Sequence, residues 1–176
     1  PAAVDAGAVD TEKRTAGLPR RIRSSLVPLF RRSPAVTVAA CFAVPFAVAY
    51  LIAAPMGRDL SAQLAHAQLA ALHWPTVLNL RWYGGFDPLG YSVLSPPVMA
   101  LLGVRLTTAL AYVASAMLFA ALLQRTAVAR PVAGAIVGAV CLTGNLVTTR
   151  TTFALGLALG LAALLTLVSR RLWVAS

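Results

Sequence analysis

The chain alternates between long uncharged apolar runs and short segments that carry most of its charges. The first run, 34–56, has no charged residue and is long enough to cross a hydrocarbon core of about 30 Å as a helix. Further apolar runs lie within 96–124, 132–149 and 152–168. The pattern predicts an all-α polytopic membrane protein with four transmembrane helices, or five if 93–104 also crosses the membrane.

Composition supports this class. Of 176 residues, 59% are hydrophobic and only 11% are charged, whereas soluble domains carry about a quarter charged residues. The net charge of +10 comes from basic residues at the ends of the apolar runs, not from a basic face with interleaved aromatics. We therefore expect membrane lipids as partners and no nucleic acid. No P-loop, nucleophile constellation or Cys/His metal pattern indicates a soluble enzyme.

Basic residues favour one topology. With four spans and a cytoplasmic N-terminus, eleven basic residues lie inside and four outside, namely Arg58, Arg81, Arg105 and Arg150. With five spans the numbers are nine and six. We therefore expect a multi-pass plasma (inner) membrane protein with a basic, largely disordered cytoplasmic tail, 1–33. A transmembrane domain, 34–176, then follows, and its external loop is 57–95.

Two features of the spans leave alternatives open. The segment 93–104 is short for a span, so it is either re-entrant or the outer part of a long helix that begins near Pro96 and Pro97. The last two spans each carry a GxxxG motif, which favours a tight hairpin between them. Four short helices form little wall for a lipid-sized cavity, so we expect either the N-terminal part of a longer polytopic protein or a small subunit.

The external loop begins with an amphipathic segment that we expect to lie along the membrane surface as a helix over 60–73. Its apolar stripe consists of Leu60, Leu64, Ala67, Ala71 and Trp74. His66 and His73 fall on a different face, near Asp59, and are expected near the lipid headgroups. Successive members of this set are seven residues apart, too far along a helix to share one metal ion.

Asp59 has two interpretations. The first is a helix N-cap, which the local spacing favours. The second is an extracytoplasmic carboxylate that serves as general base or metal ligand at a membrane cavity. Arg58 beside it would pair with a phosphate or with lipid headgroups.

The rest of the loop, WPTVLNLRWYGGFDPLGY, crowds aromatics between glycines. An interfacial aromatic belt is one interpretation. The glycines favour tight turns, which would place side chains over a carbohydrate or a lipid headgroup. The candidate substrate-binding residues here are Arg81, Trp82, Tyr83, Asp87 and Tyr91.

The order of these motifs resembles the GT-C superfamily of glycosyltransferases, which use polyprenyl-phosphate sugars. Arg58-Asp59 follows the first span, then come the amphipathic helix, Trp74-Pro75, Tyr83 and Pro96-Pro97, with GVRLTTAL afterwards. By this resemblance, Asp59 is the catalytic or metal-associated carboxylate, and a lipid-linked sugar donor and a divalent metal are expected. The chain differs from the family in having no second acidic residue beside Asp59 and far fewer spans. It also resembles uncharacterised actinobacterial polytopic membrane proteins.

The expected function is therefore that of a membrane glycosyltransferase, or its N-terminal fragment, acting outside the cytoplasm in the cell envelope. The alternative is a non-catalytic membrane subunit or scaffold that binds a protein partner or lipid through the loop 57–95.

Overall fold

The computed structural model describes residues 33–73 and 92–174, and all of its regular structure there is helical. Four of the helices are long and apolar enough to cross a membrane. They are α2 (Pro34–Ala53), α5 (Val104–Arg125), α6 (Pro131–Thr148) and α7 (Thr151–Val174). The protein is thus an all-α, multi-span membrane protein, as the apolar runs predict. The tail 1–32 and the loop residues 74–91 lie outside the described residues.

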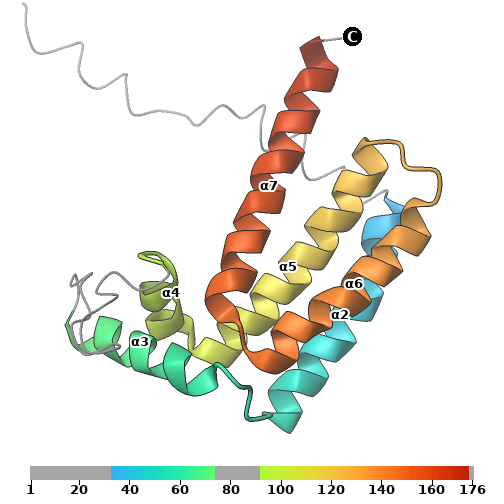
Figure 1. Cartoon of the computed structure of the whole chain (residues 1–176). Coiled ribbons are helices and arrows are strands. Elements are labelled where there is room, and N and C mark those ends of the chain that lie inside the picture. Colours follow the sequence, from blue (N-terminus) through green and yellow to red (C-terminus); the bar gives the residue numbers. More distant parts are fainter. Residues whose placement is uncertain (1–32, 74–91, 175–176) are drawn as a thin grey trace, which may run out of the picture. The chain divides into compact units, whose positions relative to one another are not determined.

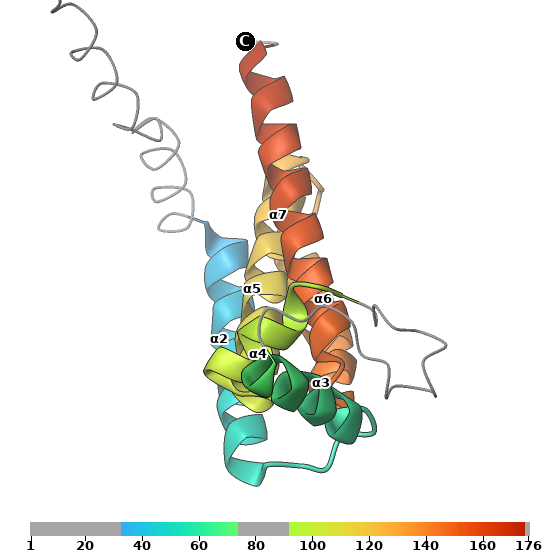
Figure 2. The same ribbon diagram turned by 90° about the vertical axis from the view of Figure 1, so that its left-hand side faces the viewer.

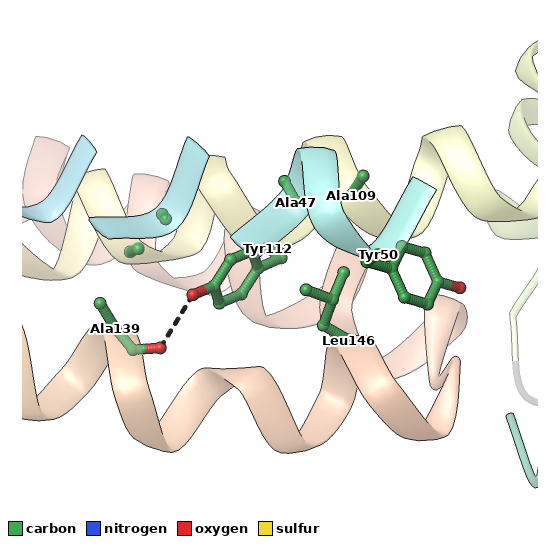
Figure 3. Close-up of a cluster of buried hydrophobic side chains, with 8 residues drawn as sticks. Ala47, Tyr50, Ala109, Tyr112, Ala139 and Leu146 are labelled. Carbon is green, nitrogen blue, oxygen red and sulfur yellow. Dashed lines mark hydrogen bonds between the residues drawn. The ribbon is translucent and has the colours of Figure 1, made fainter. Parts of the chain in front are cut away.

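α5 is the central helix of the bundle. It packs extensively against α2, α6 and α7, whereas α6 and α7 have little contact with each other and diverge from their shared turn (Figure 1). One buried cluster joins α2, α5 and α6, and consists of Ala43, Ala47, Tyr50, Ala109, Tyr112, Ala116, Ala139 and Leu146. Its many alanines let the helix backbones approach closely. Within it the Tyr112 hydroxyl donates a hydrogen bond to the Ala139 carbonyl oxygen at 3.1 Å (Figure 3).

The predicted tight hairpin of the last two spans is wrong. Gly134 and Gly138 of α6 face α5, where a side chain at either position would meet Leu123 or Phe119. Gly156 and Gly160 of α7 have open space around them. The small-residue motif of α6 therefore serves its packing against α5, and that of α7 has no partner within the described residues.

Two shorter helices, α3 (Leu60–Leu72) and α4 (Ser95–Leu102), pack against each other at one end of the bundle. α3 runs crosswise to the long helices in both views (Figure 1, Figure 2). A buried cluster of Leu60, Ala67, Met99 and Val104 ties α3 and α4 to the start of α5.

α4 is a helix of its own, so the alternative of one long helix over 96–124 is wrong. Gly103 separates α4 from α5 with φ of +83°, a conformation that residues with a side chain rarely adopt. The expected first span, 34–56, is likewise shorter, because Ala54 turns left-handed (φ 45°) and Pro55 follows. The last helix is longer than the expected 152–168 and ends at Val174.

The predicted apolar stripe of α3 is divided in the structure, because Leu60 and Ala67 are buried against the protein whereas Leu64 and Ala71 are exposed. Gln63 is buried as well, and so is His66, which was expected near the lipid headgroups. His73, at the end of the helix, is exposed as expected. An apolar stripe on a membrane protein can be satisfied by lipid, so it does not have to face the protein core. The Gln63 side chain accepts a hydrogen bond from the Thr152 hydroxyl of the bundle at 3.0 Å.

The contacts at this end distinguish the two topologies. α2 ends there and α5 begins there, since an Nη atom of Arg105 donates to the Pro55 carbonyl oxygen at 3.4 Å. α6 ends and α7 begins there too, because Arg150 contacts Asp59. Five spans would put Asp59 and Arg150 on opposite sides of the membrane, so the arrangement agrees only with four.

Candidate functional site

Asp59 stands at the N-cap position of α3, but its side chain makes no capping hydrogen bond. Its φ of −98° and ψ of 0° lie outside the extended region in which cap residues usually sit. The carboxylate oxygen Oδ2 instead accepts a hydrogen bond from Nε of Arg150 at 3.3 Å. Asp59 therefore occupies a cap position without acting as a cap, and its carboxylate faces the turn between α6 and α7.

The backbone before α3 is held against the same turn. The amide of Asp59 donates to the carbonyl oxygen of Thr148 at 3.2 Å. Gly57 lies so close that a Cβ there would collide with the Thr149 hydroxyl and come within 2.9 Å of the Thr148 carbonyl carbon. Only glycine fits this approach, and it brings Asp59 into reach of Arg150.

Buried threonines on either side of Arg150 anchor the turn. Thr149 and Thr151 are fully buried. The Thr149 hydroxyl lies 3.0 Å from that of Tyr50 in α2, and the Thr151 hydroxyl lies 2.6 Å from that of Thr108 in α5. The turn is thus fixed to two different spans.

The next residue, Thr152, connects the bundle to the crosswise helices. Its hydroxyl donates to Oε1 of Gln63 in α3 at 3.0 Å and lies 2.9 Å from the hydroxyl of Ser95 in α4. Gln63 and Ser95 are both buried. Such satisfied buried polar contacts fix geometry, because each group left without its partner would carry a desolvation cost.

The charges sit on the outside of this polar network. Asp59 keeps 41% of its side chain exposed and Arg150 keeps 61%. Arg58, beside Asp59, is exposed as well. The structure therefore presents a carboxylate and two guanidinium groups at the surface of the bundle end, on a base of buried hydroxyl and amide groups.

The remaining predicted site residues cannot be compared with this arrangement. Arg81, Trp82, Tyr83, Asp87 and Tyr91 all lie outside the described residues. Arg150 and the threonines of its turn, which do contribute to the site, were not among the predicted site residues. The run TTRTT between two apolar segments was the available signal, since hydroxyl groups in such a number are unusual beside spans of this composition.

A divalent metal would need ligands beyond those described. Asp59 is the sole acidic residue within 33–73 and 92–174, and no group of three His, Cys, Asp or Glu side chains gathers there. Hard cations such as Mg²⁺ are held by oxygen ligands, commonly one or two carboxylates with substrate phosphates and water. Asp59 fits one position of such a set.

Comparisons with protein-family models, with curated proteins and with solved structures find no match to this chain. The class that the fold defines is therefore the one stated above, a multi-span helical membrane protein.

Proposed function

We propose that the protein is a membrane-embedded glycosyltransferase, or the N-terminal part of one, that takes a sugar from a polyprenyl-phosphate donor. The single observation that carries the proposal is the state of Asp59. Its carboxylate is diverted from the helix end, held by Arg150 and left exposed. A carboxylate that only capped α3 would turn back to the amides of its own helix.

The chemistry needs one base and a means of stabilising a leaving phosphate. The acceptor hydroxyl attacks the anomeric carbon of the sugar and gives its proton to Asp59, which acts as general base. A bond forms between the acceptor oxygen and the anomeric carbon. The bond from that carbon to the phosphate oxygen breaks, and its electron pair leaves with the polyprenyl phosphate. A guanidinium such as that of Arg58 would stabilise the charge that develops there.

A lipid-linked donor suits the location of this carboxylate. It lies at the end of helices that are long and apolar enough to cross a membrane, where the phosphate of a lipid donor would reside while its chain stays in the hydrocarbon. We propose that the segment with Arg81, Trp82, Tyr83, Asp87 and Tyr91 supplies contacts to the sugar and phosphate. Asp59 would be one ligand of a divalent metal, which would supply electrostatic stabilisation of the leaving phosphate.

The proposed side is extracytoplasmic and the proposed membrane is the plasma (inner) membrane. The support is the unequal distribution of basic residues, eleven on the side of the N-terminus and four on the side of Asp59. An extracytoplasmic site is also where a lipid-linked donor is needed, because nucleotide-activated sugars are cytoplasmic.

A second candidate is a non-catalytic subunit that binds a partner membrane protein. One observation favours it. The outer face of α7 carries Gly156 and Gly160 with nothing near them, and small residues four apart allow a second helix to approach closely. In that case the Asp59–Arg150 pair would serve only to join α3 to the bundle.

The experiment compares the wild type with Asp59→Asn and Asp59→Ala in liposomes that contain polyprenyl-phosphate-linked pentoses or hexoses. Asparagine keeps the size of aspartate and a side chain suited to the N-cap position but has no charge. If Asp59 is the base, both variants lose transfer while their thermal unfolding stays close to that of the wild type. An Asn variant that transfers sugar at the wild-type rate would overturn the proposal.

A further inference from the structure

The structure assigns Arg150 as a positioning residue for Asp59, with the α6–α7 turn as the second half of the proposed site. This assignment rests on the proposed function of Asp59 as the reacting carboxylate. Arg150 lies 91 residues further along the chain, and nothing in the local sequence around Asp59 indicates it. Three features of the ion pair and its turn support this role.

The first feature is that the pair contributes little to stability. Both side chains are largely exposed, and a single hydrogen bond of 3.3 Å joins them. Exposed ion pairs of this kind contribute little to folding. Because the ion pair stabilises the fold so little, its main structural effect is on the direction of the Asp59 carboxylate. The guanidinium draws Oδ2 away from the amides at the start of α3 and toward the open surface.

The second feature is that Arg150 itself is held firmly. Its backbone amide donates to the Asn145 carbonyl oxygen at 3.1 Å, and its neighbours Thr149 and Thr151 are fully buried and hydrogen-bonded to different spans. A long arginine side chain alone is a poor positioning device, since it has many rotamers. Because the backbone on both sides of Arg150 is already fixed, only its side chain remains to be ordered.

The third feature is backbone strain at the turn. Thr149 has φ of 59° and ψ of 42°, a left-handed conformation that is uncommon for a β-branched residue. Such conformations persist where surrounding contacts enforce them, and they cluster at functional sites. Here the enforcing contacts are the Tyr50 hydroxyl and the close approach of Gly57. The strained residue sets the direction in which Arg150 leaves the turn.

A positioning role predicts a specific kinetic change. In Arg150→Ala the carboxylate is free to rotate toward the helix, and an exposed ion pair of this kind biases such an orientation by a factor of about five at most. We expect kcat to fall by up to about that factor while KM changes little, and Arg150→Lys to recover part of kcat because it restores a cationic donor. Combining Arg150→Ala with Asp59→Asn should cost nothing beyond Asp59→Asn alone. Arg130→Ala is the matched control, an exposed arginine at the start of α6, at the opposite end of the bundle.

A second measurement does not require activity. A water-soluble carbodiimide with glycine ethyl ester modifies exposed carboxylates, and mass spectrometry follows the rate at Asp59 in the purified protein. With Arg150 holding Oδ2, the rate should rise several-fold in Arg150→Ala and stay unchanged in Arg130→Ala.

The two measurements separate the two failures. If no donor is used by the wild type, the proposed function fails, while a faster modification of Asp59 in Arg150→Ala still supports the positioning. If the modification rate and kcat of Arg150→Ala both equal those of the wild type, the assignment of Arg150 is overturned even if Asp59 proves catalytic. A loss of kcat that Arg150→Lys does not relieve at all, together with early thermal unfolding, would also overturn it by indicating a merely structural role.

Discussion

The hydroxyl groups of Tyr50 and Thr149 lie 3.0 Å apart, although 99 residues separate them in the chain. Tyr50 is in the last turn of the first span, and Thr149 is the left-handed residue that ends the third. This contact joins the end of α2 to the turn between α6 and α7, at the residue before Arg150. The candidate site is therefore built on an interhelical hydrogen bond inside the fold.

Replacing Tyr50 by phenylalanine removes this bond and keeps the ring in the buried cluster. The Thr149 hydroxyl is fully buried, so it loses a partner that water cannot replace. We expect Tyr50→Phe to destabilise the protein by roughly 1–3 kcal/mol, the cost of leaving a buried polar group without its partner. Thermal unfolding in detergent measures this. Thr149→Ala combined with Tyr50→Phe should cost less than the sum of the single changes, and strict additivity would contradict the contact.

Gly57→Ala tests the close approach between the start of α3 and the α6–α7 turn. The added methyl group would collide with the Thr149 side chain and with backbone atoms of Thr148, which cannot move aside as a flexible side chain would. We expect a loss of about 1–3 kcal/mol, as for other overpacked positions. Gly144→Ala, with open space around it in α6, is the matched control and should be neutral or stabilising. Equal unfolding temperatures for the two variants would contradict the approach.

The two GxxxG motifs should respond differently to alanine. A Cβ at Gly138 would lie 2.5 Å from ring carbons of Phe119, whereas one at Gly160 would meet nothing within 4 Å. We expect Gly138→Ala to unfold at a lower temperature than the wild type and Gly160→Ala to be at least as stable. If Gly160→Ala instead abolishes co-purification of a membrane partner, the second candidate function gains support over the first.

Much of the architecture was predictable because the bilayer imposes a simple rule on sequence. A helix that crosses the membrane must be apolar over its whole length, so the run from Pro34 to Ala53 identifies itself without any knowledge of its neighbours. Helix interruptions are less visible. Gly103 breaks the predicted second span because of its positive φ, and a glycine within an apolar run does not by itself reveal that conformation.

The sequence did not predict which helix faces contact each other. A small-residue motif indicates a close contact but not its partner, so Gly138 could have met either neighbouring span and in fact meets α5. The predicted stripe of α3 is divided, since Leu64 is exposed and Leu60 is buried, while Gln63 turns inward to Thr152. The candidate carboxylate Asp59 could be named from its place after the first span. Its partner Arg150 could not, because their contact exists only once α2, α3, α6 and α7 have assembled.

The last prediction concerns the sides of the membrane. The four-span arrangement places Ser61, which is exposed in α3, on the same side as Arg150 and opposite to Ala127 in the α5–α6 connection. We expect the Ser61 side to be extracytoplasmic, given the asymmetry of basic residues. The free cysteines Cys41 and Cys141 are first replaced, and single cysteines are then introduced at Ser24, Ser61 or Ala127. In intact cells an impermeant thiol reagent should modify only the cysteine at position 61, and disruption of the membrane should expose the other two. Labelling at 24 and 127 but not at 61 would reverse the orientation and place Asp59 in the cytoplasm, where a lipid-linked donor would no longer be needed. If only one of the cysteines at 24 and 127 is labelled in intact cells, the four-span fold itself is contradicted.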